Sequence, residues 1–213
     1  MSTSARPAIP RLHLVTNRQL CRSGGQATIV EQAARGGLGA VQLREKDLDE
    51  RALYDEAVAL RAVLGATPLL VNGALGVARA LGAAGVHLPE TAGSVAAARA
   101  VLGLRALVGR SVHDVEGAQR AAAEGTDYLI LGTIYATASK PGRAPAGLEL
   151  VRAVAAAVPT PIIAIGGIDE TNAAATIAAG AWGIAVMSGI LRASDPAEAV
   201  RRLRVAIGDV RGG

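Results

Sequence analysis

Short apolar runs alternate along this chain with longer amphipathic segments. The runs are rich in Val, Ile and Leu and end at polar residues or glycine, a pattern that indicates buried parallel strands. They lie at residues 12–16, 40–44, 68–72, 85–88, 106–111, 128–132, 162–168 and 183–189. The amphipathic segments predict helices at 27–35, 49–64, 75–81, 114–124, 148–157, 170–179 and 196–207, and one more that begins at the capping residue Ser94.

Strict alternation of strand and helix predicts a parallel sheet, and eight such units predict a closed (β/α)8 TIM barrel of the α/β class. An open doubly wound sheet is the alternative, disfavoured because no Gly-x-Gly-x-x-Gly motif follows the first strand. The 213 residues suffice for one barrel, and no linker divides them. We therefore expect a single catalytic domain over residues 11–213, preceded by a flexible tail at residues 1–10.

Two glycine-containing segments in the last third of the chain predict a phosphate site. Gly166 and Gly167 follow the seventh predicted strand, and Ser188 and Gly189 follow the eighth. In TIM barrels these two loops supply bare backbone N–H groups, and a short helix adds the positive end of its dipole. Glycine lets the backbone approach a phosphate closely. The competing interpretation is that Gly166 and Gly167 only form a tight turn.

Polar residues gather where the predicted strands end, which is the face of a TIM barrel that holds the chemistry. Gln42, Arg44 and Lys46 are spaced by two, so their side chains point to one side of an extended chain. The same rim contains Thr16, Asn72, His87, His113, Lys140 and Ser188. Lys140 lies in a longer loop, residues 133–147, which has the composition of a mobile active-site loop. Any one of these could be a solvated loop residue, but their convergence favours a single binding site.

His113 is the strongest candidate for proton transfer. It lies past the fifth strand and before a predicted helix N-terminus, which disfavours the imidazolium form and keeps a neutral imidazole available near pH 7. The competing interpretation is a capping or packing histidine. His87 lies inside an apolar run and is expected to be a hydrogen-bonded core residue, and His13 is expected to pack within the first strand.

Composition narrows the class of ligand. Aromatic residues make up only 2% of the chain, so base stacking on nucleic acid is poorly supported. The net charge of +4 comes from scattered basic residues and suits a small anionic substrate. The single Cys21 excludes an internal disulfide and a cysteine-based zinc site. No acidic pair or His-x-x-x-His motif lies at a strand end, so we predict no metal site.

The chain has no apolar stretch of membrane-spanning length and no signal-peptide hydrophobic region. We therefore expect a soluble, cytoplasmic protein that binds neither membranes nor nucleic acid.

Six motifs, taken in order along the chain, resemble those of one enzyme superfamily. They are Gln42-Leu43-Arg44-Glu45-Lys46, Gly85-Val86-His87-Leu88, Gly109-Arg110-Ser111-Val112-His113, Thr137-Ala138-Ser139-Lys140, Ile165-Gly166-Gly167-Ile168 and Ala185-Val186-Met187-Ser188-Gly189-Ile190. The set resembles the thiamine phosphate synthase and thiazole tautomerase superfamily over about residues 12–207. The resemblance implies a TIM barrel, a small phosphorylated thiazole as substrate and a homodimer as the assembly. It adds Ser111, Thr137 and Ser139 to the expected substrate-binding residues.

The superfamily has two branches, which make different predictions for this chain. The synthase joins a hydroxymethylpyrimidine pyrophosphate to a thiazole phosphate and releases pyrophosphate with the help of magnesium. Synthases carry two aspartates for that cation, where this chain has Gly73 and Ala92, with Glu90 nearby. The tautomerase aromatises a thiazole carboxylate phosphate by moving a proton, needs no metal and uses a histidine that matches His113.

The missing aspartates favour a metal-independent thiazole tautomerase, an isomerase of thiamine biosynthesis with His113 as its acid and base and with no cofactor. The substrate- and phosphate-binding residues are then Gln42, Arg44, Lys46, Asn72, Ser111, Thr137, Ser139, Lys140, Gly166, Gly167, Ser188 and Gly189. Two alternatives stay open. One is a thiamine phosphate synthase, a transferase that requires magnesium, and the other is a non-catalytic barrel that binds a phosphorylated metabolite.

Overall fold

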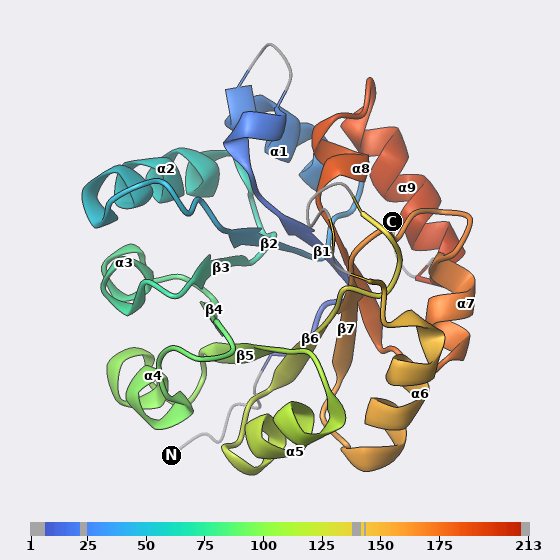
Figure 1. Cartoon of the computed structure of the whole chain (residues 1–213). Coiled ribbons are helices and arrows are strands. Elements are labelled where there is room, and N and C mark those ends of the chain that lie inside the picture. Colours follow the sequence, from blue (N-terminus) through green and yellow to red (C-terminus); the bar gives the residue numbers. More distant parts are fainter. Residues whose placement is uncertain (1–6, 22–24, 138–141, 143, 210–213) are drawn as a thin grey trace.

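The strands form a closed parallel barrel in the order β1 to β8, as predicted. The computed structural model describes residues 7–21, 25–137, 142 and 144–209. The strands are β1 (Leu12–Val15), β2 (Ala40–Leu43), β3 (Leu69–Asn72), β4 (Gly85–Leu88), β5 (Leu107–Val112), β6 (Tyr128–Gly132), β7 (Ile162–Ile165) and β8 (Gly183–Val186). Figure 1 shows these strands at the centre with the helices arranged around them. The TIM barrel predicted from the alternation is therefore confirmed.

The helices follow the strands in sequence and cover the outside of the barrel. They are the 3-10 helix η1 (Arg18–Leu20), α1 (Gly25–Arg35), α2 (Glu50–Val63), α3 (Leu75–Leu81), α4 (Val95–Leu102), α5 (Val115–Ala123), α6 (Gly147–Ala157), α7 (Ala173–Ala178), α8 (Ser188–Leu191) and α9 (Pro196–Ala206). Side chains of Asp49, Ser94 and Asp114 accept a hydrogen bond from the backbone N–H three residues on, so they cap α2, α4 and α5.

Three predicted boundaries near the carboxyl end were wrong, and one of them is the run 162–168, which is a strand only to Ile165. The helix predicted at 170–179 begins at Ala173, because the side chain of Asp169 accepts from the N–H of Thr171 and that of Asn172 from the N–H of Asp169. Such local bonds hold the backbone in a turn in place of a helix. The run 183–189 is a strand only to Val186, and Ser188 begins the short helix α8.

Histidine and tyrosine side chains fill part of the barrel interior. Tyr128 is fully buried, and its ring centroid lies 5.4 Å from that of His13 and 5.7 Å from that of His87. The His13 Nε2 bonds the carbonyl oxygen of Pro10 at 2.9 Å, and the His87 Nε2 lies 2.8 Å from the hydroxyl oxygen of Ser111. Both histidines thus pack in the core, in agreement with the sequence.

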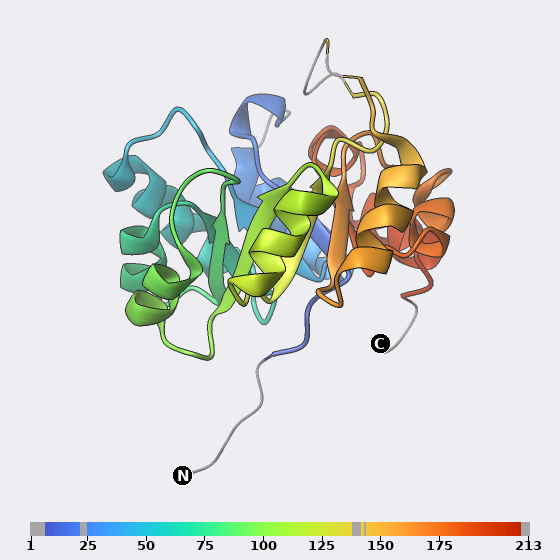
Figure 2. The same ribbon diagram turned by 60° about the horizontal axis from the view of Figure 1, so that its bottom comes forward.

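The two ends of the barrel differ in what they present. In Figure 2 the segment that leads into β1 enters at the lower end, whereas the loop between β6 and α6 rises at the upper end. Residues 1–6 of the predicted tail lie outside the described residues, while the carbonyl oxygen of Ile9 accepts a hydrogen bond of 2.9 Å from Trp182. In the described part of the chain, every helix is too short or too polar to cross a membrane.

Candidate active site

A cavity of about 600 Å³ opens among the loops that follow the barrel strands. The predicted residues on its lining are Gln42, Arg44, Lys46, Asn72, Ser111, His113, Thr137, Gly166, Gly167 and Ser188. Gly189 is not on this lining, and Ser139 and Lys140 lie outside the described residues. The structure therefore gathers most of the predicted residues around one cavity, and what they bind stays a prediction.

Two cationic side chains reach the cavity from β2 and the loop after it. Arg44 and Lys46 line the cavity together with Gln42, while Leu43 and Glu45 between them are buried elsewhere. This is the alternation expected of an extended chain. Burial lowers the pKa of Arg44, and the carboxylate of Glu45 partly opposes that shift. The guanidinium of Arg44 nevertheless remains charged at neutral pH, so this edge of the cavity suits an anion.

Glu90 and His113 lie together on the lining, from the loops that follow β4 and β5. The His113 Nε2 lies 3.7 Å from the Glu90 Oε2, and the His113 Nδ1 donates to the carbonyl oxygen of Gly132. A carbonyl oxygen only accepts, so the proton is on Nδ1 and the other ring nitrogen is turned toward the carboxylate. Among the described lining residues Glu90 is the single acidic side chain.

Arg110 of β5 holds the loop that carries Glu90. Its guanidinium donates to the carbonyl oxygens of Pro89 at 3.2 Å, Glu90 at 3.1 Å and Gly93 at 2.9 Å. It also pairs with the carboxylate of Glu124 at 3.0 Å. Arg110 is buried, so these bonds are shielded from water and fix the loop firmly.

The glycines after β7 have a packing role that the sequence did not reveal. Gly166 has a φ of 105° and Gly167 a φ of 65°, both in the region that favours glycine. A Cβ on Gly166 would clash with the side chain of Thr133, and one on Gly167 with the carbonyl oxygen of Ala136. Both glycines are thus required by the approach of the β6–α6 loop, whether or not they also approach a phosphate.

Arg192 adds a third cation to the cavity, close to the predicted phosphate loops. It follows α8 directly and lines the cavity with Ser188 at the start of that helix. Arg192 was not predicted from the sequence, and neither were Asn17 and Leu20 after β1, which also line the cavity. Nothing in the spacing of these residues marked them, because they lie beyond the strands, where no strand periodicity sets the direction of a side chain.

Two buried histidines of the barrel interior are neutral, and one of them, His87, also lines the cavity. Burial lowers the pKa of His87 to about 3, and the positive charges of Arg44 and Arg110 contribute to this shift. Burial likewise lowers the pKa of His13 to about 4, although the hydrogen bond to the carbonyl oxygen of Pro10 opposes that shift. Both imidazoles are therefore uncharged at neutral pH, and neither adds a positive charge beside the cavity.

Comparison with known proteins identifies the family. The family model described as thiamine monophosphate synthase matches residues 12–190. The chain belongs to the thiamine monophosphate synthase family. It is 42% identical over 200 residues to the thiamine-phosphate synthase of Chloroflexus aurantiacus, covering 92% of each chain. It is also 42% identical over 207 residues to that of Moorella thermoacetica, covering 94% of this chain and 97% of the relative.

A solved structure of the same name agrees. The thiamine phosphate pyrophosphorylase from Pyrococcus furiosus matches with a TM-score of 0.83 at 31% identity, over 95% of this chain and 97% of that one. The chain therefore belongs to an enzyme family, and the relatives reported above carry the name of the synthase.

The prediction of a thiazole tautomerase was wrong. It rested on two positions, Gly73 and Ala92, whereas the identity to synthases extends over nearly the whole chain. Two substitutions in neighbouring loops are weak signals for a branch, because magnesium can be held by one carboxylate and the phosphates of a substrate. Proton transfer by His113 was predicted for the tautomerase reaction, so without that reaction this role has no support.

The described residues fit magnesium only if phosphate oxygens of a substrate complete its ligands. Within them, no group of three or more His, Cys, Asp or Glu side chains could hold a metal ion. Glu90 nevertheless places one carboxylate on the lining, and Asn72 adds an amide oxygen. Magnesium commonly retains several waters and takes one or two carboxylates together with substrate phosphates. The residues therefore fit a cation that arrives with pyrophosphate and do not fit a closed protein cage.

Proposed function

We propose that this protein is a thiamine phosphate synthase, which joins a hydroxymethylpyrimidine pyrophosphate to a thiazole phosphate and releases pyrophosphate. The observation that carries the proposal is that one cavity has cations from two separate strand ends, Arg44 and Lys46 after β2 and Arg192 after β8. Two anionic substrates need two such regions. The 42% identity to proteins named thiamine-phosphate synthase supports this choice over other phosphate-binding barrels.

The reaction is a substitution at the carbon that carries the pyrophosphate. The bond from this carbon to oxygen breaks, pyrophosphate leaves with the electron pair, and the thiazole nitrogen forms the new bond with its lone pair. Negative charge grows on the leaving pyrophosphate, so fixed cations that face it stabilise the transition state more than the ground state. Arg44 and Lys46 are the residues that we assign to this task.

The thiazole phosphate is assigned to the second group, at the loops after β7 and β8. Ser188 and Gly167 line the cavity there, and Arg192 adds a positive charge. The first N–H groups of a helix have no partner within the helix and can bind an anion, as that of Ser188 would at the start of α8. This arrangement would hold both substrates on the same side of the barrel with their reacting atoms between the two anion regions.

Magnesium belongs to the proposal as the cofactor that a synthase requires. Glu90, with the amide oxygen of Asn72, would hold it together with the oxygens of the substrate's pyrophosphate. When bound, it would supply further positive charge to the leaving group. His113 lies beside Glu90 and would orient that carboxylate.

The test is a synthesis assay with both substrates and magnesium. We expect thiamine phosphate and pyrophosphate in equal amounts, and loss of product when EDTA removes the cation. Lys46→Gln should lower kcat/KM by about 100-fold, since a cation that faces the leaving group is lost. Glu116→Gln, an exposed carboxylate of α5, is the matched control and should leave the rate unchanged. Folded protein that forms no thiamine phosphate at any magnesium concentration would overturn the proposal.

A further inference from the structure

A buried carboxylate lies directly behind the cationic edge of the cavity. The side chain of Glu45 is only 1% exposed, although its neighbours Arg44 and Lys46 both reach the cavity. Burying a charge is unfavourable unless hydrogen bonds and counter-charges compensate for lost water. The reaction proposed above makes no use of Glu45, so its burial needs another explanation.

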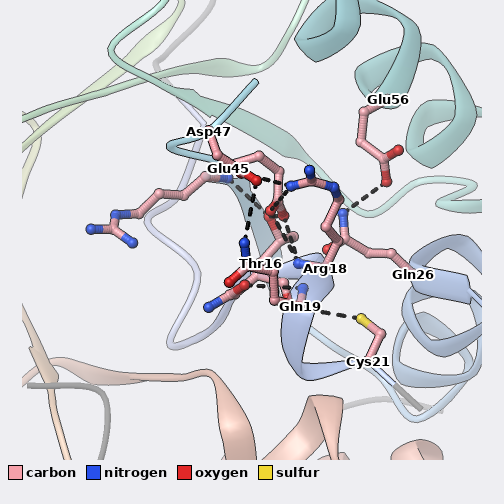
Figure 3. Close-up of polar contacts among 10 residues, drawn as sticks. Thr16, Arg18, Gln19, Cys21, Gln26, Glu45, Asp47 and Glu56 are labelled. Atoms are coloured by element: carbon pink, nitrogen blue, oxygen red, sulfur yellow. Dashed lines mark hydrogen bonds and ion pairs between the residues drawn. The ribbon is translucent and has the colours of Figure 1, made fainter. Parts of the chain in front are cut away.

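The hydrogen bonds of Glu45 run to the loop after β1. Its Oε1 accepts from the hydroxyl of Thr16 at 2.7 Å, and its two oxygens accept from the backbone N–H of Arg18 at 3.2 and 3.0 Å. The Arg18 guanidinium lies 3.7 Å away. Figure 3 shows how Thr16 and Arg18 converge on Glu45. Asp47, two residues after Glu45, accepts a hydrogen bond from the guanidinium of Arg18. The carboxylate is thus fully used in joining two loops.

Thr16 completes the connection back to Arg44. Its N–H donates to the carbonyl oxygen of Gln42 at 3.0 Å, which continues the parallel ladder of β1 and β2. One step further along a parallel ladder, the N–H of Arg44 would donate to the carbonyl of Thr16. It donates instead to the Thr16 hydroxyl, at 2.9 Å. The hydroxyl therefore relays a chain of bonds from the backbone of Arg44 to the carboxylate of Glu45 at the point where the two strands separate.

We infer that Thr16 and Glu45 are positioning residues, which hold Arg44 and Lys46 in the geometry that receives the pyrophosphate group. The inference rests on the proposed function, because it assigns an anion to these two cations. The bonds among Thr16, Glu45 and the N–H groups of Arg18 and Arg44 form what we call the Thr16–Glu45 network. The network joins two loops that both line the cavity, one with Asn17 and Leu20 and the other with Arg44 and Lys46. A shift of about 1 Å in groups that hold a reacting substrate can cost about 100-fold in rate.

The variants follow from the bonds. Thr16→Val keeps the shape of the side chain but removes the hydroxyl, whereas Thr16→Ser keeps the hydroxyl. Glu45→Gln places an amide NH₂ against the N–H of Arg18 or the hydroxyl of Thr16, and it removes the charge. Asp47→Asn is the matched control, since Asp47 bonds Arg18 at 2.6 Å and lies in the same loop but is half-exposed and outside the network.

The measurement is the Kd of inorganic pyrophosphate by titration calorimetry, with and without magnesium, alongside KM for each substrate. Thr16→Val and Glu45→Gln should weaken pyrophosphate binding by about 10-fold and raise KM for the pyrimidine pyrophosphate to match. KM for the thiazole phosphate should change less than about 2-fold, and Thr16→Ser and Asp47→Asn should resemble the wild type.

Three results would overturn the inference. The first is wild-type pyrophosphate affinity in Thr16→Val, and the second is an equal loss of affinity for both substrates. The third is a change confined to the thermal unfolding temperature, which would reveal a purely structural role. If the wild type binds pyrophosphate but makes no thiamine phosphate, the proposed function fails, while the comparison of affinities still decides the role of the network.

Discussion

The imidazole Nε2 of His113 lies 3.7 Å from a carboxylate oxygen of Glu90 at the edge of the cavity. Glu90 is the single acidic side chain on the described lining. The loop that carries Glu90 is fixed by Arg110, which donates hydrogen bonds to three of its carbonyl oxygens. The carboxylate of Glu90 is therefore held at the cavity, next to His113.

Glu90→Gln should raise the magnesium concentration needed for half-maximal synthesis by about 10-fold, because the only described carboxylate of the site is lost. A second readout is the binding of Mn²⁺ in the presence of inorganic pyrophosphate, followed by electron paramagnetic resonance, which should weaken in parallel. An unchanged requirement for magnesium would show that Glu90 does not hold the cation.

Ala92→Asp should act in the opposite direction. Ala92 is exposed in the loop that carries Glu90, so an aspartate fits there without repacking the core. It restores a carboxylate where synthases carry one, and we expect half-maximal synthesis at several-fold lower magnesium. The matched control is Ala92→Asn, which has the same shape without the charge, and equal magnesium curves for the two variants would contradict the prediction.

Arg192→Gln should raise KM for the thiazole phosphate by about 10-fold and change KM for the pyrimidine pyrophosphate little. The physical reason is the loss of a charged hydrogen-bond donor to one of the two anions, which is worth about 1.5–3 kcal/mol when buried and less at a rim. Arg202→Gln removes an arginine of α9 that pairs with Glu170 away from the cavity, and its kinetics should match the wild type. A larger rise in KM for the pyrimidine pyrophosphate would mean that Arg192 binds the pyrophosphate group and not the thiazole phosphate.

Stability should fall with acidification below about pH 6.5. His13 and His87 are neutral in the folded chain, with pKa values of about 4 and about 3, but take up a proton near 6.5 when unfolded. Above pH 6.5 neither state binds the proton. Below it the unfolded state alone does, so each histidine lowers the free energy of unfolding by about 1.4 kcal/mol per pH unit until its folded pKa is reached.

Urea unfolding of the wild type and His87→Gln at pH 6.5 and pH 5.5 measures this effect. The variant should lose about 1 kcal/mol less over that interval. Ser111→Ala removes the hydrogen-bond partner of His87 but keeps the imidazole, so it should retain the wild-type pH dependence. Equal slopes for wild type and His87→Gln would disprove the prediction.

Gly109→Ala should destabilise the barrel by about 3 kcal/mol, because the new methyl group would overlap the ring of Tyr128. Tyr128→Leu should relieve part of this cost in the double variant, even though it is destabilising alone. Chemical denaturation of the four proteins in a double-mutant cycle gives the coupling. Additive changes in the free energy of unfolding would mean that the ring of Tyr128 is not what excludes a side chain at Gly109.

The sequence by itself determined the fold. The barrel follows from the alternation of β-branched runs with amphipathic helices, because each pattern repeats at the period of its element and needs no knowledge of distant residues. The same local rules predicted the caps Asp49, Ser94 and Asp114. They also predicted the cavity-facing alternation of Gln42, Arg44 and Lys46, because strand periodicity and the common face of barrel strand ends are both readable in one dimension.

The tertiary structure alone decided which side chains share the cavity and which support it. Arg192 and Asn17 join the site from the segments that follow α8 and β1, where neither strand nor helix periodicity sets the direction of a side chain. Thr16 lies at the predicted rim yet points to a buried glutamate, and Gly166 serves the packing of a loop from β6. A residue's position along a strand fixes the side to which it points, but its partners depend on distances across the barrel, which only the folded chain sets.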